Sequence, residues 1–343
     1  MAMRSHRIDI SGSAEAVYDY AYRHGWTDGL PIIPPTPESV GRMIDYVGRR
    51  GDEIIAEVPP AMGDATVEKI AINAVMAGCL PEYMPVLIAA VEAMVEPEYQ
   101  LYGVQTTTNP VAPLLMLNGP IRHKLDINSE IGCLGPCWRS NSTIGRAVRL
   151  ILLNIGGATP GSVDKATHGM PGKYVLCFGE NEEASPWNPF HADRGFSRET
   201  STVTVVAPSG TVNVNAANRD PKEIVLIIAN TLGQWGSNSV IYGHGEPVVI
   251  MNPGHAAVLA DAGYSKADLQ RSLWQDSGVL ASMLPYKSRS RPPVEHPDGI
   301  ARAAARPEDI LIVVAGAPEP LHAVVLHPFG ASVAVTKAVV NGG

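Results

Sequence analysis

The sequence predicts an α/β protein made of two pseudo-symmetric αβ units with mixed sheets and a ligand cleft at their junction. Short apolar stretches typical of strands alternate along the chain with amphipathic stretches typical of helices. One pattern, a helix followed by Tyr-Gly, a strand and an Asn beside Gly and Pro, occurs twice. With 343 residues, 45% of them hydrophobic and 17% charged, the chain can bury a large core.

Helix start and stop signals define the first third of the chain. Ser13 and Thr36 are side-chain caps for helices over residues 12–24 and 37–48. A third helix ends before Gly78, a residue suited to the left-handed backbone of a C-cap. The further elements predicted here are a strand over 53–58 and helices over 66–77 and 81–95.

Residues 101–118 are expected to form two apolar, strand-like runs separated by a polar insert. Gln105 and Thr107 in this insert either line a binding pocket or satisfy one another's hydrogen bonds in a turn. The insert is therefore the first candidate binding segment along the chain.

Residues 128–157 are interpreted as a Gly/Pro/Cys-rich loop that leads into an amphipathic helix. Ser140, Asn141 and the serine after them can each cap that helix, and Arg139 comes directly before them. A helix N-terminus beside a guanidinium attracts anions, so this segment, together with Arg146, is a candidate anion site. The alternative is an ordinary capped helix whose arginines pair with nearby carboxylates.

A strand predicted over residues 173–179 is followed by three carboxylates and an imidazole, Glu180, Glu182, Glu183 and His191. Ionisable groups at strand ends are where α/β enzymes place their chemistry. Glu182 or His191 is a candidate for moving a proton, and a divalent metal bound by this set is an alternative. The spacing matches no standard zinc signature, and a solvated acidic loop is the other interpretation.

The remaining sequence predicts more strands and helices and one Pro-rich arm. Asp220 caps one helix and Ser265 another. Residues 239–252 are expected to be two strands broken by a turn that brings His244 and Glu246 together. Further strands are predicted over 201–208, 309–316 and 322–330, and a flexible arm or lid over 276–308.

The repeated pattern suggests how the chain is divided. Leu-Tyr-Gly precedes the strand that ends at Asn118, and Ile-Tyr-Gly precedes the strand that ends at Asn252, so the two asparagines look equivalent. We expect two αβ units, residues 1–172 and 173–343, with the ligand cleft between them. A chance match of two short stretches is the alternative.

Composition excludes several classes of partner. The formal net charge is −8 and the basic residues are dispersed, which argues against nucleic acid or an anionic membrane surface. No apolar run approaches the roughly 20 residues that span a bilayer, and the first residues lack an apolar leader, so a cytoplasmic protein is expected. No nucleotide cofactor is expected, because the chain lacks the Rossmann glycine fingerprint and the P-loop.

Four cysteines are too few for a disulfide scaffold of this size, so reduced thiols are expected. Cys79 lies between Gly78 and the predicted helix that begins at Pro81. A thiol at a helix N-terminus is stabilised as the thiolate, which makes it nucleophilic. The alternative is a buried cysteine that only packs in the core.

Six motifs together resemble an uncharacterised bacterial family associated with UGSC-motif (seleno)proteins: DGLP, PPAMGDATVEK, NAVMAGC, PVAPLLMLNGPI, SNSTIGRAVRL and GENEEASPW. The resemblance covers most of the chain and implies a cytoplasmic, small-molecule enzyme with a thiol or selenoprotein partner. The UGSC sequence itself is absent from this chain. Cys137 replaces the glycine expected in similar chains, which puts a redox role for Cys133 and Cys137 in doubt.

Three functions follow as hypotheses. The first is a lyase or hydrolase acting on a small carboxylate-bearing substrate held at Arg139, with Glu182 or His191 moving a proton and His244 assisting. The second is a thiol-dependent enzyme using Cys79 with a selenol or thiol partner. The third is a non-catalytic subunit of a complex that docks through the arm at 276–308. In each case we expect a homo-oligomer.

Overall fold

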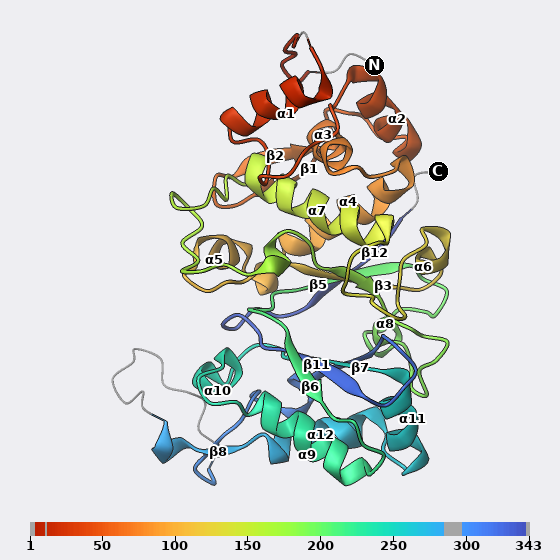
Figure 1. Cartoon of the computed structure of the whole chain (residues 1–343), viewed down its shortest axis with the longest axis vertical. Helices are drawn as coiled ribbons and strands as arrows, with labels where there is room; N and C mark the ends of the chain where they lie inside the picture. The colour runs from red at the N-terminus through yellow and green to blue at the C-terminus, as the bar shows by residue number, and fades with distance from the viewer. Residues whose placement is uncertain (1–3, 11, 285–296, 341–343) are drawn as a thin grey trace.

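The computed structural model describes residues 4–10, 12–284 and 297–340, with 39% helix and 16% strand. Two four-stranded mixed sheets lie one above the other, and helices cover the outer side of each sheet (Figure 1). The structure therefore confirms an α/β fold with mixed sheets. Within the described residues, no helix combines the length and the apolar character needed to cross a bilayer.

The helix caps predicted in the N-terminal part are confirmed. The side chains of Ser13 and Thr36 accept hydrogen bonds from backbone N–H groups of the first helical turn. Gly78 ends a helix at φ 94°, a conformation that strains residues with a side chain. The helices of this part are α1 (Ala14–Arg23), α2 (Pro37–Val47), α3 (Val67–Ala77) and α4 (Met84–Met94).

The helix of the predicted anion loop differs from expectation. α7 (Arg139–Asn154) has Trp138 at its N-cap and no side-chain cap hydrogen bond, so capping by Ser140 or Asn141 is wrong. Both side chains lie in the first turn and bond the preceding loop instead. Ser140 Oγ donates to the Asp126 carbonyl at 2.5 Å, and Asn141 Oδ1 accepts from the Asn128 N–H at 2.8 Å.

The first sheet has the strand order β12-β5-β3-β4. The central strand β3 (Leu114–Asn118) is parallel to β4 (Cys177–Gly179) and antiparallel to β5 (Thr202–Val206). The last strand of the chain, β12 (Val335–Ala338), pairs antiparallel with β5 at one edge. Because β4, β5 and β12 all follow residue 172, the predicted boundary at 172 does not coincide with the separation of the sheets.

The second sheet, β10-β7-β11-β6, repeats the strand directions of the first. Its central strand β7 (Val248–Met251) is parallel to β10 (Leu311–Val314) and antiparallel to β11 (His322–Leu326). The edge strand β6 (Val212–Asn215) pairs antiparallel with β11. The chain thus leaves the first sheet after β5 to supply β6, and leaves the second sheet after β11 to supply β12.

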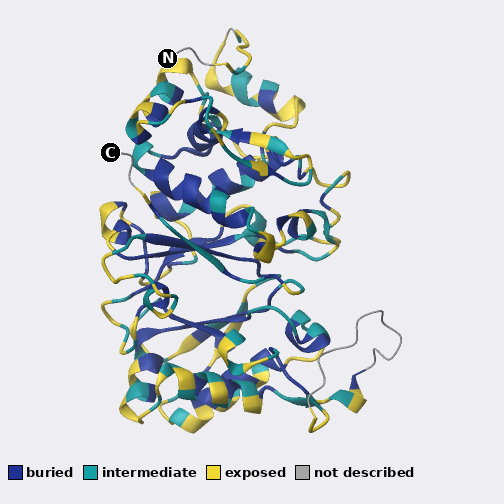
Figure 2. Cartoon of the chain, turned by 180° about the vertical axis from the view of Figure 1, so that it is seen from behind, coloured by how far each residue is buried: buried dark blue, intermediate teal, exposed yellow. Residues whose placement is uncertain are grey.

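Alternation along the strands divides the core into three layers. Leu115 and Leu117 of β3 face α3, α4 and α7, whereas Leu114 and Met116 face the second sheet. The other face of the second sheet packs on α9 (Pro221–Leu232), α11 (Pro253–Asp261) and α12 (Lys266–Asp276). Figure 2 shows both sheets and the helix faces against them as buried.

Two predicted strands are helices instead. Residues 101–106 form α5 (Leu101–Thr106), and residues 238–242 form α10 (Asn238–Tyr242). Capping overrides the apolar pattern at α10, because Ser237 Oγ accepts from the Val240 N–H and Gly243 ends the helix at φ 60°. The predictions of strand for these two segments are wrong.

Short elements complete the fold. The predicted arm at 276–308 is described only in part, because residues 285–296 lie outside the described residues. Its described ends contribute β8 (Val279–Leu280) and β9 (Ile300–Ala301), which pair with each other. The remaining elements are the hairpin β1 (Ile54–Val58) and β2 (Gly63–Thr66), and the helices α6 (Ile121–Lys124) and α8 (Phe190–Asp193).

Candidate functional site

A cluster of polar side chains lies where three strands of the first sheet meet the layer between the sheets. Asn118 is the last residue of β3 and pairs in register with Thr202, the first residue of β5. Glu180 follows the last residue of β4, which lies beside β3. Because Leu114, Met116 and Phe178 face the second sheet, alternation turns Asn118 and Glu180 to the same side.

Glu180 is fully buried, with no exposed surface. Its Oε2 accepts hydrogen bonds from Asn118 Nδ2 at 2.5 Å and from the Phe190 backbone N–H at 2.7 Å. Burial raises the pKa of Glu180 to about 7, against the opposing effects of Lys266 and of these two hydrogen bonds. A carboxyl with this pKa exchanges its proton near neutral pH.

Glu182 and Glu183 surround the buried guanidinium of Arg122. The Arg122 Nη1 and Nη2 atoms donate to the two oxygens of Glu183 at 3.0 and 2.8 Å. The Arg122 Nε lies 3.1 Å from Glu182 Oε1, which also accepts from the Gly119 N–H at 2.7 Å. The hydrogen bond from Arg122 lowers the pKa of Glu183 to about 2. Glu183 is therefore ionised at neutral pH.

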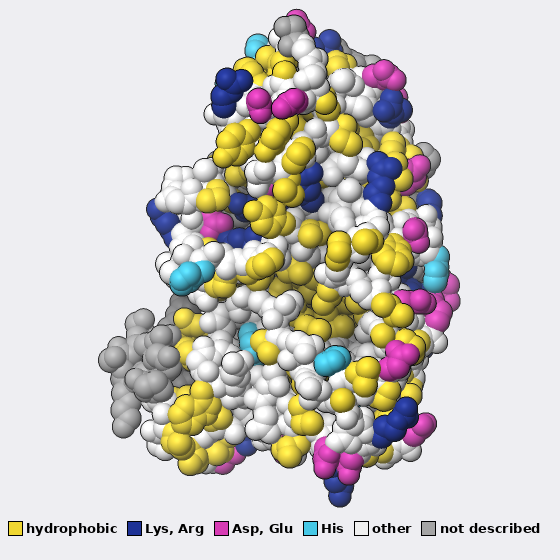
Figure 3. Space-filling view, viewed as in Figure 1, with side chains coloured by type: hydrophobic (Ala, Val, Ile, Leu, Met, Phe, Trp, Pro, Cys, Tyr) yellow, Lys and Arg dark blue, Asp and Glu magenta, His cyan; other side chains and the backbone are white. Residues whose placement is uncertain are grey.

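The cluster extends from the interior to the surface. The side chain of Arg122 is 3% exposed, while those of Glu183 and His123 are 57% and 69% exposed and lie 2.9 Å apart. Figure 3 shows acidic side chains and a histidine gathered over α6, at the edge of the molecule. The Arg122–Glu183 pair is thus the connection between solvent and the buried carboxyl.

Six buried polar atoms of the cluster have no hydrogen-bond partner among the described residues. They are Asn118 Oδ1, Arg122 Nε, Glu180 Oε1, Thr202 Oγ1 and both ring nitrogens of His191. The nearest charged atom to the imidazole is Glu182 Oε1, 3.9 Å from His191 Nδ1 and beyond hydrogen-bond length. Leaving such atoms unpaired costs about 1–3 kcal/mol each, which marks the cluster as a place where a ligand or water supplies the missing bonds.

Of the predicted catalytic residues, the structure brings Glu182 and His191 together but not His244. His244 is half-buried in the turn between α10 and β7. Among the described residues no hydrogen bond or ion pair joins it to Glu182 or His191. Glu246 is separate as well, since its Oε2 accepts from the Ala334 N–H at 2.5 Å.

Cys79 is 7% exposed and its Sγ donates to the Thr143 carbonyl at 3.2 Å. Burial raises the pKa of Cys79 to about 12, and Arg139 and Arg146 offset only part of this effect. The thiol is therefore protonated at neutral pH. This environment is typical of a packing cysteine and not of a nucleophile.

The residues predicted to hold an anion make internal contacts. Arg139 donates from Nε and Nη2 to the Gly78 carbonyl at 3.1 and 2.9 Å. Arg146 forms a two-bond ion pair with Asp28, at 2.8 Å for each bond. Asn141 donates to the Asn128 carbonyl at 3.0 Å. Arg146 matches the alternative in which the arginines pair with nearby carboxylates, whereas Arg139 bonds a backbone carbonyl and the helix has no side-chain cap.

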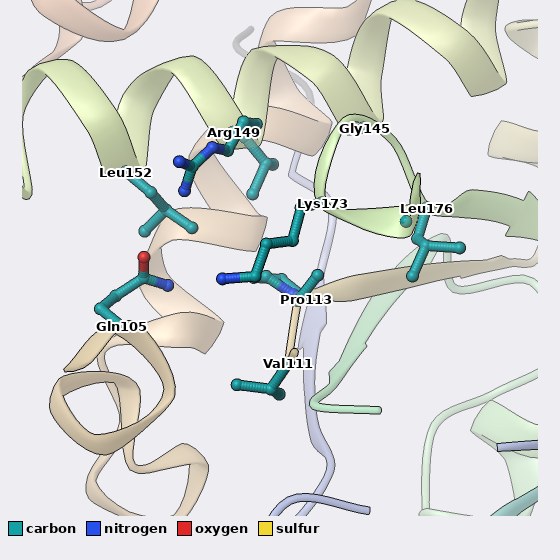
Figure 4. Close-up of a pocket in the computed structure, with 11 residues that line it drawn as sticks. Gln105, Val111, Pro113, Gly145, Arg149, Leu152, Lys173 and Leu176 are labelled. Atoms are coloured by element: carbon teal, nitrogen blue, oxygen red, sulfur yellow. The ribbon is translucent and has the colours of Figure 1, made fainter. Parts of the chain in front are cut away.

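Gln105 and Thr107 have different surroundings. Thr107 Oγ1 accepts from the Asn109 N–H in a turn, as one of the two interpretations expected. Gln105 is 5% exposed and lines a small pocket with Arg149 and Lys173 (Figure 4). This pocket lies near the amino ends of β3 and β4, at the opposite end of these strands from Glu180.

A second, larger pocket of about 630 Å³ lies between the segment 5–10 and helices α1, α2 and α3. Its walls include Trp26, Ile32 and Met76, and Glu68 closes one side by accepting from the Arg4 and Ser5 N–H groups at 3.0 and 2.9 Å. Neither pocket contains residues of the second sheet, so the ligand cleft expected at the junction stays a prediction.

In the part of the chain that the structure describes, no group of three or more His, Cys, Asp and Glu side chains has the arrangement of a metal site. Glu182 instead receives its hydrogen bonds from Asn118 and Gly119. The divalent metal suggested by the sequence stays a prediction.

Three residues of the cluster were not predicted from the sequence. Arg122 and Thr202 were not singled out, and Asn118 was noted only for its place in the repeat. The signal available was the motif Asn-Gly-Pro-Ile-Arg directly after a buried strand, which places Arg122 one helical turn beyond Asn118. Thr202 could not be found without the register of β3 and β5.

Comparison of the chain with protein-family models, with curated proteins and with solved structures finds no match.

Proposed function

We propose that the protein is an enzyme that transfers a proton to or from a small carboxylate-bearing substrate, as a lyase or hydrolase, with Glu180 as the general acid/base. The observation that carries the proposal is the buried Glu180 carboxyl, whose pKa is raised to about 7 and whose Oε1 is unpaired. General acid/base catalysis is most effective when the catalytic pKa lies near the working pH. Clusters with perturbed pKa values are typical of functional sites.

Neighbouring residues have distinct roles in this proposal. Asn118 Nδ2 and the Phe190 N–H hold Oε2 of Glu180, which leaves Oε1 to take or give the proton. Glu182, which accepts from Gly119 and Asn118, fixes the asparagine and balances the charge of Arg122. Glu182 or His191 was the predicted proton carrier, but Glu182 accepts hydrogen bonds from Asn118 and Gly119 and lies beside Arg122, so we assign it a positioning role.

Arg122 supports the choice of a carboxylate substrate. Its two terminal nitrogens bind both oxygens of Glu183, the side-chain geometry that a substrate carboxylate would also offer. Glu183 is 57% exposed and can turn into solvent when a substrate carboxylate takes its place. The substrate then lies between Arg122 and the unpaired atoms of Glu180, His191 and Thr202.

We also infer that the chain consists of two related αβ units. The two sheets have the same pattern of parallel and antiparallel strand pairs, and Asn118 and Asn252 follow corresponding positions of β3 and β7. The backbone N–H of Asn181, beyond β4, donates to the Val314 carbonyl at the end of β10 at 2.7 Å. This contact supports a junction formed by the carboxyl ends of both sheets, and we place the ligand cleft there.

Nuclear magnetic resonance in D₂O tests the proposed function. A panel of small 2-hydroxy, 3-hydroxy and 2-oxo acids, together with simple carboxylate esters, is incubated with the protein and followed for C–H exchange, elimination or hydrolysis. We expect turnover of at least one class, reduced about 100-fold or more in Glu180→Gln. Glu199→Gln, at an exposed position, is the control with unchanged rate.

Two outcomes would oppose the proposal. The first is that no member of the panel reacts with the unmodified protein. The second is that Glu180→Gln retains the full rate while remaining folded. No observation favours the thiol-dependent or the non-catalytic alternative over this function, so a selenol or thiol partner, a homo-oligomer and a cytoplasmic location stay proposals.

A further inference from the structure

The pocket beside α7 contains more positive charge than its own residues neutralise. Arg149 and Lys173 enter it with side chains only 14% and 16% exposed, and they share one carboxylate, Asp164. Lys173 Nζ lies 2.5 Å from Asp164 Oδ2, whereas the Arg149 Nη1 lies 4.0 Å from the same oxygen. Two cations and one anion leave a net charge of about +1 in a shielded place, where charge is costly to leave unpaired.

A third polar group lies in the same space. The Gln105 side chain is 5% exposed, and its amide makes no hydrogen bond with any other described residue. Figure 4 shows the Gln105 amide, the Arg149 guanidinium and the Lys173 ammonium turned toward one common space below α7. Arg149 Nη2 donates to the Ala158 carbonyl at 3.3 Å and Lys173 donates to Asp164, whereas the Gln105 amide faces the pocket. An acceptor placed in the pocket would meet all three groups.

Burial destabilises the charged forms of Arg149 and Lys173, and a bound anion would offset this effect. Burial lowers the pKa of Arg149, and Asp164 restores only part of the loss. Burial also lowers the pKa of Lys173, even with its hydrogen bond to Asp164. An added negative charge stabilises both charged forms.

We propose that this pocket is an anion-binding site for the carboxylate end of a small ligand, held by Arg149, Lys173 and Gln105. The cavity of about 20 Å³ holds about one water-sized group, such as a carboxylate oxygen, so the rest of the ligand lies toward the opening. A carboxylate suits these donors better than a spherical ion, because its two oxygens can meet the Arg149 fork and the other groups at once.

The site is separate from the proposed catalytic cluster. It lies by Val111 and Leu176, which precede β3 and β4, whereas Asn118 and Glu180 lie at the other end of these strands. Five residues of β3 span roughly 15 Å at 3.3 Å each. One small substrate cannot contact both places, so the ligand of this pocket is a second ligand.

Isothermal titration calorimetry with sodium acetate, in a chloride-free buffer, tests the site. We expect saturable binding to the unmodified protein. Gln105→Leu breaks no ion pair and should weaken binding about tenfold, the effect of losing one hydrogen bond to a charged group. Lys173→Met should weaken it at least as much. Lys165→Met, at an exposed neighbour of Asp164, is the matched control with unchanged binding.

Gln105→Glu supplies a second readout that does not depend on weak binding. Its carboxylate takes the place of the ligand, so we expect acetate binding to disappear and the melting temperature to rise. Unchanged acetate affinity in both Gln105→Leu and Lys173→Met would overturn the site, as would a lower melting temperature in Gln105→Glu. Chloride binding more tightly than acetate would overturn the carboxylate assignment. Glu180→Gln should leave acetate binding at this pocket unchanged, which keeps this test distinct from that of the proposed function.

Discussion

The two sheets have the same pattern of parallel and antiparallel strand pairs, yet the polar residues at the ends of β3 and β7 differ in one respect. Both polar atoms of the Asn252 side chain in the second sheet have hydrogen-bond partners. Its Oδ1 accepts from the His255 N–H, and its Nδ2 donates to the His322 carbonyl. Asn118 in the first sheet has an unpaired Oδ1 beside a buried carboxyl. Ala315 follows β10 where Glu180 follows β4. The end of the second sheet at Asn252 therefore serves stability, whereas the end of the first sheet at Asn118 carries unpaired and ionisable groups.

The largest effect is expected from Arg122→Met. Removing the buried guanidinium leaves Glu182 and Glu183 without their cation, and breaking a buried pair in this way costs about 3–5 kcal/mol. Urea unfolding measures the loss. Arg306→Met is the control, because the Arg306 guanidinium pairs with Asp309 at the surface, where ion pairs add little to stability. Equal losses in both variants would mean that the cluster is no more than a surface ion-pair network.

Glu180→Gln is expected to change how stability depends on pH. The unfolded carboxyl releases its proton near pH 4.5, while folded Glu180 keeps it until about pH 7. The folded state binds more protons in this window, so the stability of the unmodified protein falls as pH rises from 4.5 to 7.

The resulting difference is about 3 kcal/mol between pH 4.5 and pH 8, from roughly 2.5 pKa units at 1.36 kcal/mol each. Urea unfolding of both proteins should show Glu180→Gln gaining stability relative to the parent as pH rises. A constant difference across this range would mean that folding does not raise the pKa of Glu180. The corresponding Ala315→Gln in the second sheet should show no such pH dependence.

The smallest effect is expected from Asn252→Ala. It removes the cap of α11, which costs about 1 kcal/mol at every pH, and it should leave turnover unchanged.

Asn118→Ala, the matching change in the first sheet, removes a hydrogen bond that lowers the pKa of Glu180. The pH at which the stability of the protein stops falling should therefore move upward. Thermal unfolding across pH compares the two. An identical response at both positions would remove the distinction between the ends of the sheets.

Local signals in the sequence were enough for much of the fold. Caps at Ser13, Thr36, Asp220 and Ser265 begin helices as predicted, because each depends on a few neighbouring residues. The strands over 309–316 and 322–330 are confirmed in their apolar centres. Local signals do not predict which distant strands pair, so the sequence does not show that β12 lies beside β5.

The sequence predicted the segment that contains the candidate site, but not which of its carboxylates is buried. The rule that ionisable groups collect at strand ends pointed to Glu180–Glu183, and the structure shows a polar cluster there. Choosing among the carboxylates needs burial and contacts, which separate a fully buried Glu180 from a hydrogen-bonded Glu182. The anion loop shows the converse, since Arg139 and Arg146 point to an anion by position but meet the Gly78 carbonyl and Asp28.

The exchange of β6 and β12 between the sheets has a consequence for how the chain acquires its structure during synthesis. The first sheet receives β12 from residues 335–338, after all four strands of the second sheet have been made. Until then β5 has an open edge, which is a template for pairing with other chains. Synthesis of the second sheet thus precedes closure of the first, and neither sheet can be completed by one half of the chain alone.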